Sequence, residues 1–300
     1  MPFNRLNRGK SLSKIQGTLN ASESITATGG AVTYASGKTI HTFTGSGPLS
    51  VSSFINPATV SYSPSTVSYR KIGSTVAAAA VEYLVVAGGS SGDGGHQEGG
   101  AGGQVLIGST PVSSPREITV GGGGPATPNN NDVYNIGNPS SFGPEIIATG
   151  GAVGGPGVGP APENAAVGSF GIGSGGLNTG GASPSLENRR GGNGRQSSIS
   201  GTNLYYGGGG GAAGGAGYET SQGGRGGYGG GGGGGTGPGG PGGTPGNQNG
   251  SYGSPTGPGG AAGATNSGGG GGSGGIGFCG SVYCSGNSGG SGIVIIAYPS

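Results

Sequence analysis

Glycine dominates one stretch of this chain, from Gly88 to Gly292. The 300-residue sequence holds 85 glycines, and all but eight of them lie in that stretch. Glycine loses more conformational freedom on folding than any other residue, at about 0.5–1 kcal/mol relative to alanine. Few apolar side chains are present to offset this cost. If the stretch is ordered, it must be stabilised by hydrogen bonds and close contacts between backbones.

The glycine runs 207–211, 229–235 and 268–272 argue against most regular structures. Each glycine in a helix interior costs about 1 kcal/mol, and in a sheet it gives neighbouring strands no side chain to pack against. A left-handed threefold helix of the polyproline type avoids both problems, because its backbone groups point outward. Such helices can bond to one another side by side, which pairs buried backbone groups. The sequence therefore predicts packed polyglycine II helices, with disorder as the alternative.

Prolines within the glycine runs support the threefold helix. Proline fixes φ near the value that this helix requires, and the stretch contains Pro238, Pro241, Pro245 and Pro258. Glycine also recurs at every third position from residue 237 to residue 246. Collagen is excluded, because this period is lost at Asn249 and a triple helix needs it unbroken.

Composition and charge exclude several classes of protein. Only 29% of the residues are hydrophobic and tryptophan is absent, so no conventional core of any size is available. The formal net charge is +2, although residues 1–86 hold seven basic and two acidic residues. This excess favours a basic attachment arm at residues 1–20 and is too slight for nucleic-acid binding. No apolar run approaches the ~20 residues of a membrane span, and the start lacks the apolar segment of a secretory signal.

Alternating apolar and small polar residues predict strands in the first quarter of the chain. The alternation covers residues 24–28, 31–34, 39–44, 49–51 and 59–69. A Gly-Ser-Gly-Pro break at 45–48 predicts a hairpin between the third and fourth of these strands. We therefore expect a small antiparallel β domain at residues 21–75, followed by a glycine-rich domain at residues 76–300.

Two continuous apolar runs frame the glycine-rich part, Tyr83–Ala87 at its start and Ile293–Tyr298 at its end. Continuous apolar sequence is typical of a strand buried on both faces. Each run needs an apolar partner in a chain that has few, so we expect the two to be neighbours. Further short strands are predicted beside the glycine runs at residues 104–107, 117–120, 145–148 and 204–206. The predicted fold class is thus mainly β and irregular, with polyglycine helices framed by short strands.

The segments Ile40–Gly47, Val81–Gly89 and Gly290–Pro299 resemble the glycine-rich domain of tail-associated proteins from aquatic bacteriophages, cyanophages among them. The glycine body is also similar in kind to the polyglycine sandwich of T-even phage tail-fibre adhesins. The resemblance covers roughly residues 40–300. It implies a fold that stacks threefold glycine helices in layers and presents variable loops to a host receptor.

The function implied by this resemblance is that of a virion structural protein of a phage tail, a tail fibre or fibre-tip adhesin that binds host cell-surface glycan. Such a protein is made in the host cytoplasm and carried on the virion tail. Its partners would be other tail proteins, through the N-terminal region, and a host polysaccharide or outer-membrane receptor; a homotrimer is compatible with this role. Neither nucleic-acid binding nor membrane insertion is expected. The alternative is a purely architectural virion protein, such as a fibre connector or a capsid decoration.

Motifs typical of enzymes are explained by glycine abundance. The G-x-G-x-x-G match at 171–176 lacks the strand and helix of a dinucleotide site. Three matches to G-x-S-x-G occur in one chain, which indicates coincidence. Asp93, His96 and Glu98 could meet on one loop as metal ligands, but no second cluster supports them, and a solvated loop is the alternative. We expect no catalytic residue, no metal and no cofactor.

Cys279 and Cys284 flank four residues, a spacing compatible with a disulfide across a tight hairpin. A particle assembled in a reducing cytoplasm would form this bond only after release. Two buried free thiols are the alternative.

Tyrosine and arginine interrupt the glycine runs, and these residue types are enriched at recognition surfaces. Flat aromatic faces also suit sugars. The candidate receptor-binding residues are Arg189, Arg190, Arg195, Tyr218, Arg225 and Tyr252. We expect them to gather at one end of the glycine body, with solubilising loops as the alternative.

Overall fold

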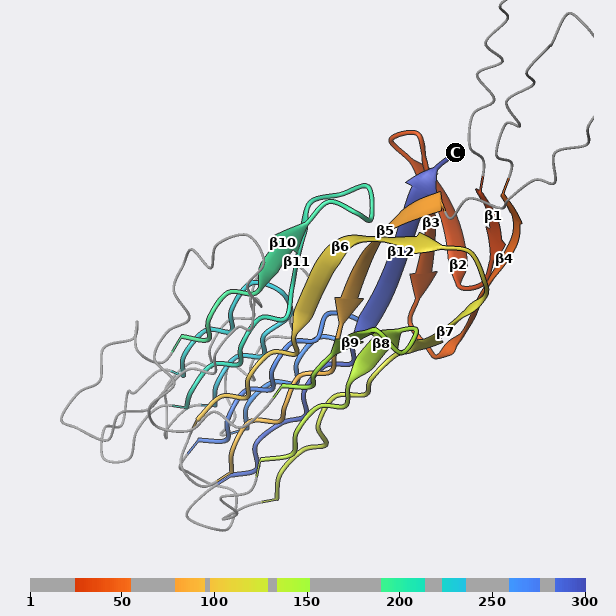
Figure 1. Cartoon of the computed structure of the whole chain (residues 1–300). Helices are drawn as coiled ribbons and strands as arrows, with labels where there is room; N and C mark the ends of the chain where they lie inside the picture. Colours follow the sequence, from red (N-terminus) through yellow and green to blue (C-terminus); the bar gives the residue numbers. More distant parts are fainter. Residues whose placement is uncertain are drawn as a thin grey trace, which may run out of the picture.

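The computed structural model describes residues 25–54, 79–94, 98–128, 134–151, 190–213, 223–235, 259–275 and 284–300. Regular structure in these residues is all β, with antiparallel pairing and no helix. Strands gather at one end of the molecule and glycine segments extend from them toward the other end (Figure 1). The coarse prediction of a mainly β and irregular fold is therefore confirmed.

One five-stranded sheet has the order β2-β3-β12-β5-β6. Its strands are β2 (Ala31–Ala35), β3 (Lys38–Phe43), β12 (Ile293–Pro299), β5 (Ala79–Val86) and β6 (Val105–Val112). The central strand β12 pairs antiparallel with β5, with Ile295 opposite Leu84. The predicted pairing of the first and last apolar runs is confirmed.

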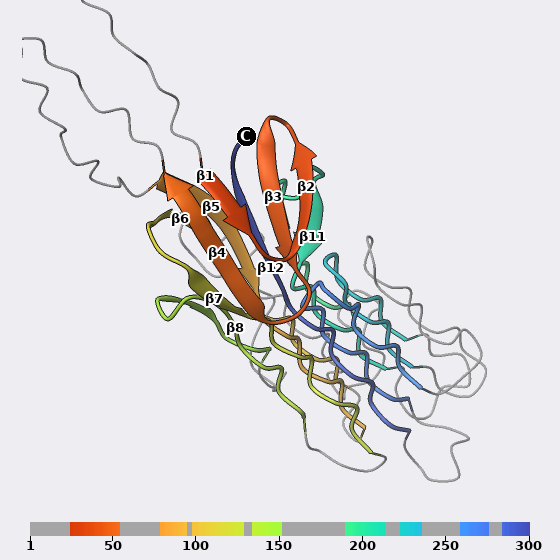
Figure 2. The ribbon, with the colours of Figure 1, turned by 90° about the vertical axis from the view of Figure 1, so that its right-hand side faces the viewer.

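A second five-stranded sheet has the order β1-β4-β7-β8-β9. It consists of β1 (Ile25–Thr28), β4 (Gly47–Phe54), β7 (Arg116–Thr119), β8 (Ser140–Phe142) and β9 (Ile146–Ala148). The two sheets pack around a shared core that includes Val85, Phe142 and Val294. Figure 2 shows strands β1 and β4 beside β2 and β3. This end of the molecule is a β-sandwich with an apolar core, so the expectation that no conventional core is available is wrong for this part of the chain.

The hairpin of β10 (Arg195–Ser197) and β11 (Leu204–Tyr206) covers the outer face of the first sheet. Tyr206 packs there against a second cluster that contains Leu84 and Ile295. Alternate residues of β5 and β12 thus point into opposite clusters, as the pleat of a strand requires. Both strands are buried on both faces, which explains why their sequences are continuously apolar.

The predicted hairpin between residues 39–44 and 49–51 is wrong. Strand β3 pairs with β2 and β4 pairs with β1, so the break at residues 45–48 carries the chain from one sheet to the other. The hairpin is instead β2–β3, where Ser36 and Gly37 adopt φ of 51° and 72°. Strands of residues 25–54 therefore enter both sheets. The predicted domain boundaries at residues 20 and 75 lie outside the described residues and stay predictions.

A buried histidine connects the first and last described strands. The Nδ1 atom of His41 lies 2.7 Å from the carbonyl oxygen of Gly29, which can only accept, so Nδ1 carries the proton. The Nε2 atom then accepts from the Tyr298 hydroxyl at 2.9 Å. Both side chains are buried and their rings stack, with centroids 5.5 Å apart. This bonding fixes β12 against the chain reversal between β1 and β2.

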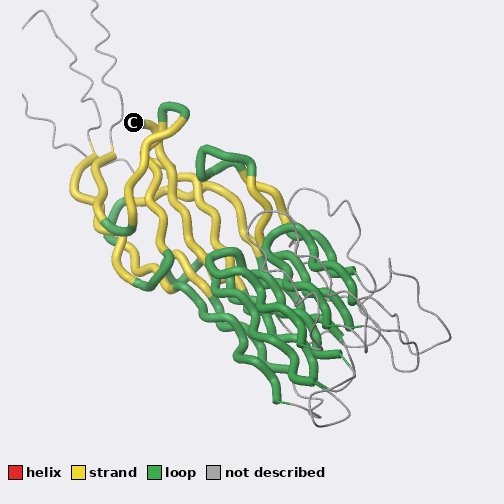
Figure 3. The backbone as a smooth tube through the Cα atoms, turned by 180° about the vertical axis from the view of Figure 1, so that it is seen from behind, coloured by secondary structure: helices red, strands yellow, loops and turns green. Residues whose placement is uncertain are grey.

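Glycine-rich segments run alongside one another and connect directly to the strands (Figure 3): they follow β5, β7 and β11 and precede β6 and β12. In segment 87–93 the backbone N–H groups bond to three neighbouring segments in turn. Those of Ala87, Ser90 and Asp93 donate to the carbonyls of Gln104, Ala101 and Glu98. The two residues between each pair donate to segments 135–138 and 287–290. The bonding repeats every third residue, whereas an antiparallel strand ladder repeats every second.

Segment 270–274 bonds to segment 87–93 with the same three-residue period, but it runs parallel to that segment, whereas segment 98–104 runs antiparallel to it. Gly271 and Gly274 donate to Ser90 and Asp93, so donors and acceptors ascend together and the two segments are parallel. Gly270 and Ser273 likewise donate to residues 208 and 211. We call these packed glycine segments the bundle. It combines parallel and antiparallel neighbours, and segment 87–93 bonds to more neighbours than the two that a strand has in a sheet.

Space, rather than backbone torsion, is what requires glycine inside the bundle. Among the described residues from 88 to 292, glycines with positive φ lie at turns and bends, such as Gly229 and Gly268. Elsewhere a β-carbon at Gly89, Gly210 or Gly271 would come closer than 3.0 Å to the carbonyl oxygen of a neighbouring segment. Each interior glycine leaves room for the adjacent backbone.

Burial separates interior from peripheral segments. Every described residue of segments 87–94, 207–213 and 269–275 is buried. In the peripheral segment 223–228 the order is buried, buried, exposed, and the pattern then repeats with Tyr228 half-buried. One residue in three thus faces outward at the surface of the bundle.

Candidate functional site

Two peripheral glycine segments present large polar side chains side by side on one flank of the bundle. One has the sequence Arg190-Gly-Gly-Asn193 and the other Arg225-Gly-Gly-Tyr228. The segments are parallel, because Gly191 N–H donates to the Arg225 carbonyl and Gly194 N–H donates to the Tyr228 carbonyl, each at 2.8 Å. We call the four side chains of Arg190, Asn193, Arg225 and Tyr228 the arginine–tyrosine ledge.

The glycines of segment 223–228 explain why these side chains point outward. A β-carbon at Gly223 or Gly226 would meet the carbonyls of segment 231–235, and one at Gly227 would meet that of Gly192. The remaining direction, taken by Arg225 and Tyr228, faces no neighbouring segment. Arg190, Asn193 and Arg225 are exposed and Tyr228 is half-buried. The packing of neighbouring segments in the bundle therefore determines which residues of this segment reach solvent.

Ring contacts hold the ledge in place. The Arg190 guanidinium carbon lies 5.5 Å from the centre of the Tyr228 ring, and the Tyr205 ring centre of β11 is 5.4 Å from the same ring. The backbone N–H of Tyr228 also donates to Asn193 Oδ1 at 3.1 Å. The ion pairs found in the described part of the chain are Lys38–Glu82 and Arg116–Glu145, so no described carboxylate neutralises the ledge arginines. The ledge is a cationic and aromatic surface.

The structure brings together two of the six predicted receptor-binding residues, Arg190 and Arg225. Arg195 is half-buried at the start of β10, on the sandwich side of the bundle, and does not belong to the ledge. Arg189, Tyr218 and Tyr252 lie outside the described residues. A receptor-binding role for all six stays a prediction.

The six predicted residues do not include Asn193, Tyr205 and Tyr228, which also belong to this surface. The signal that could have found two of them is the shared spacing, since both Arg-Gly-Gly stretches place their next large residue three positions later. Three residues make one turn of a threefold helix. Side chains so spaced point in one direction.

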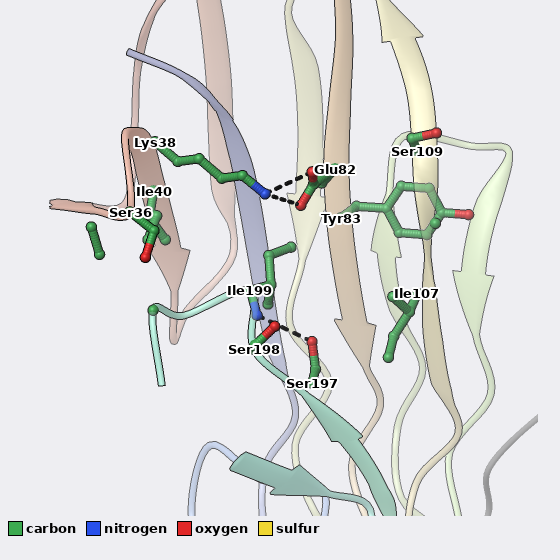
Figure 4. Close-up of a pocket in the computed structure, with 13 residues that line it drawn as sticks. Ser36, Lys38, Ile40, Glu82, Tyr83, Ile107, Ser109, Ser197, Ser198 and Ile199 are labelled. Atoms are coloured by element: carbon green, nitrogen blue, oxygen red, sulfur yellow. Dashed lines mark hydrogen bonds and ion pairs between the residues drawn. The ribbon is translucent and has the colours of Figure 1, made fainter. Parts of the chain in front are cut away.

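A groove on the outer face of the first sheet is a second site, which no sequence pattern indicated. It lies between the β2–β3 turn, the sheet and the loop after β10, and has a volume of about 570 Å³. Figure 4 shows Lys38 bonded to both carboxylate oxygens of Glu82 at 2.7 Å, with Ile199 beside the sheet. Serine hydroxyls line its rim, at residues 36, 109, 197 and 198. This lining offers donors and acceptors to a small polar molecule.

The predicted cluster of metal ligands is only partly described. Asp93 and Glu98 are buried, at 0% and 7% exposure, so these two carboxylates do not lie on a solvated loop. The Tyr134 hydroxyl donates to Glu98 Oε2 at 2.6 Å. His96 lies outside the described residues, and within the described ones no group of three metal-ligating side chains occurs.

Cys284 is buried and disulfide-bonded. Cys279 lies outside the described residues, so its pairing with Cys284 stays a prediction. A search of the described ranges for apolar helices long enough to cross a membrane finds none.

Comparison with known families identifies a glycine-rich domain in this chain. A family model described as a glycine-rich domain matches residues 65–299, which is most of the chain. The chain belongs to this family. The match includes the paired strands β5 and β12 of the first sheet and the whole bundle between them. No curated protein matches this glycine-rich chain.

Proposed function

We propose that the glycine segments are polyglycine II helices. The support is the bonding of segment 87–93, whose donors take three neighbours in turn and return to the first after three residues. A helix with three residues per turn presents its N–H groups in three directions, which matches this order. A crystal structure of the bundle should give φ near −75° and ψ near +145° in segments 208–211 and 231–235. A regular two-stranded β ladder there would contradict the proposal.

We further propose that the protein is a virion structural protein of a phage tail, a tail fibre or fibre-tip adhesin that binds host cell-surface glycan and has no catalytic role. It is made in the host cytoplasm, and its N-terminal region docks on other tail proteins. The resemblance of the framing segments to phage tail-associated proteins motivates this function. The observation that carries it is that backbones pack inside the bundle, whereas large side chains occur at its surface.

A backbone-packed interior with side chains at the surface suits a virus particle, which must hold its recognition surface rigidly. Binding residues placed on a rigid scaffold can change without disturbing what supports them. In segment 223–228 the glycines are enclosed by neighbouring backbone, while the side chains of Arg225 and Tyr228 lie at the surface, where the Tyr228 ring contacts Arg190 and Tyr205. Recognition and stability are therefore carried by different positions.

The experiment replaces Arg190, Tyr218 and Arg225 together with alanine in the virus and measures adsorption to host cells. We expect adsorption to be lost while particle assembly and the thermal unfolding midpoint are unchanged, since surface substitutions usually shift stability by about 0.5 kcal/mol or less. Arg116→Ala, on the sandwich, is the matched control and should adsorb normally. Antibody labelling of particles in the electron microscope should place the protein on the tail.

Unchanged adsorption by the triple variant would favour the architectural alternative, a fibre connector or capsid decoration. Labelling on the capsid, away from the tail, would overturn both the adhesin and the fibre connector.

A further inference from the structure

We propose that the arginine–tyrosine ledge binds a polysaccharide that carries carboxylate groups. This inference rests on the proposed glycan-binding function and deepens it by naming the chemistry of the ligand. It also places the binding surface on the flank of the bundle, on two neighbouring glycine segments.

The first argument is charge. Arg190 and Arg225 are exposed, and no described carboxylate pairs with either guanidinium. Arginine has a planar group whose donors match the two oxygens of a carboxylate, so a bidentate contact is available at each. Two such groups on one surface favour an anionic ligand over a neutral one.

The second argument is shape. Tyr228 is half-buried and its ring contacts Arg190 and Tyr205, which fixes its position while part of the residue stays accessible. Asn193 uses Oδ1 to accept from the Tyr228 backbone, and its amide nitrogen takes no part in that bond. An aromatic ring beside amide and guanidinium donors suits the apolar face and the hydroxyls of a sugar. A phosphate backbone would need the charges without the ring.

The third argument is periodicity. Arg225 and Tyr228 are one threefold turn apart, and so are Arg190 and Asn193, which corresponds to about 9 Å along the bundle at ~3.1 Å per residue. This spacing is comparable to the length of a disaccharide. The two parallel rows therefore offer repeated contacts to an extended chain of linked sugars.

The fourth argument is rigidity. Each ledge residue is flanked by glycines whose N–H or carbonyl groups bond to other segments, as at Gly191, Gly194, Gly224 and Gly227. The backbone therefore loses little freedom when ligand binds. Preorganisation of this kind improves affinity by lowering the cost of ordering.

The test measures binding of polygalacturonate, a linear carboxylated polysaccharide, to the purified full chain by isothermal titration calorimetry. Neutral dextran and single-stranded poly(dT) are the comparison ligands. The variants are Arg190→Ala/Arg225→Ala, the charge-preserving Arg190→Lys/Arg225→Lys, Tyr228→Ala, and Arg116→Gln as a control on the sandwich. Circular dichroism and the thermal unfolding midpoint verify that each variant is folded.

We expect polygalacturonate to bind and dextran to bind far more weakly. The double alanine variant should lose about tenfold or more in affinity, as the removal of charge-assisted bonds predicts. The double lysine variant should keep part of the affinity, Tyr228→Ala should lose part of it, and Arg116→Gln should match the wild type. Raising the salt concentration should weaken binding, because these charges are exposed.

Several results would overturn the inference: no binding of polygalacturonate by the folded wild type, equal binding of dextran, equal loss in Arg116→Gln, or tighter binding of poly(dT), which would indicate a nucleic-acid surface. The proposed function fails separately. If polygalacturonate binding meets these expectations but the Arg190→Ala/Arg225→Ala virus adsorbs normally, the ledge binds carboxylated glycan without serving attachment. If that virus fails to adsorb and polygalacturonate does not bind, attachment stands and the ligand class is wrong.

Discussion

Val85 in the sandwich and Gly89 in the bundle are both completely enclosed, but different groups enclose them. Val85 packs among side chains that include Phe142 and Val294. The space where Gly89 would carry a side chain is occupied by the backbone of residues 268 and 269. Sandwich packing depends on side-chain volume, whereas bundle packing depends on the absence of side chains. Loss of side-chain volume should therefore destabilise the sandwich, and gain of side-chain volume should destabilise the bundle.

The largest effect is expected from exchanging two adjacent residues of the bundle, Arg225→Gly together with Gly226→Arg. Composition is unchanged, but the arginine now points at the carbonyl of Gly231. We expect the free energy of unfolding to fall by more than about 4 kcal/mol, in the range of exceptional substitutions. Chemical denaturation monitored by circular dichroism measures it.

Arg225→Ala is the matched control for this exchange. It keeps the register of the segment and should change stability by about 0.5 kcal/mol or less. Equal stability of the exchange variant and this control would show that the bundle does not specify which third residue faces outward.

In the sandwich, the damaging change is loss of volume. Phe142 is completely buried, with its ring 6.3 Å from that of Tyr83. Phe142→Ala should cost about 3–5 kcal/mol, because it leaves a cavity in the shared core of the two sheets. The denaturant midpoint measures the loss, and Phe142→Leu should lose clearly less. A loss below 1.4 kcal/mol, or about tenfold in the unfolding equilibrium, would mean that the sheets do not share one core.

In the bundle, the damaging change is gain of volume. A methyl group at Gly210 would overlap the carbonyl group of Gly271. Gly210→Ala should therefore destabilise by about 1–3 kcal/mol, as overpacking does, although alanine for glycine at a compatible φ normally stabilises by about 0.4–1 kcal/mol. The same denaturation experiment measures the change.

Gly122→Ala supplies the comparison within the bundle. Gly122 is exposed, and the nearest atom to its β-carbon would be Asn138 Nδ2 at 3.6 Å. This variant should be slightly more stable than the wild type. A gain of stability at residue 122 with a loss at residue 210 would confirm that lack of space requires glycine inside the bundle. Stability changes of the same sign would contradict it.

The smallest effect concerns alkaline pH and the sandwich. Burial raises the pKa of Tyr206 above its ordinary value near 10, although a hydrogen bond from Ser200 opposes the rise. Burial likewise raises the pKa of Tyr298, against the opposing hydrogen bond with the Ala27 backbone. In both residues the folded state favours the neutral phenol. Their contribution to stability is therefore complete below pH 10 and is lost as the pH rises through the folded-state pKa values.

The unfolding midpoint, measured from pH 8 to pH 11 (about two units below and one above the ordinary tyrosine pKa), should fall at the upper end of that range. Tyr206→Phe should show a shallower fall than the wild type. An equal fall in both proteins would assign the alkaline sensitivity to other groups.

The sequence predicted best the strands whose residues form a clear apolar or aromatic run. The continuous apolar runs at β5 and β12 led to the correct prediction that these strands pair, although β5 also pairs with β6 and β12 also pairs with β3. Strand β11 was predicted at its observed bounds, residues 204–206. The β3–β4 hairpin was predicted wrongly, because Gly45 and Pro48 indicate a turn without determining which strands pair across it.

The candidate site was less predictable for a similar reason. The groove depends on Lys38 and Glu82, which are 44 residues apart and meet through the pairing of β3, β12 and β5. The ledge depends on two short segments lying side by side. Composition identified Arg190 and Arg225 as candidates, and their three-residue spacing to Asn193 and Tyr228 could have identified the rest. The neighbour relation of the two segments was not available from local sequence.

The threefold bonding also constrains how the length of this protein can change. In the polyglycine II helix proposed above, removing three residues from a segment shortens it by one turn, about 9 Å, and returns every later residue to its former direction. Removing one residue rotates every later residue by a third of a turn, which sends outward-facing side chains such as that of Tyr228 against neighbouring carbonyls. Insertions and deletions that preserve the fold should therefore come in multiples of three residues within these segments.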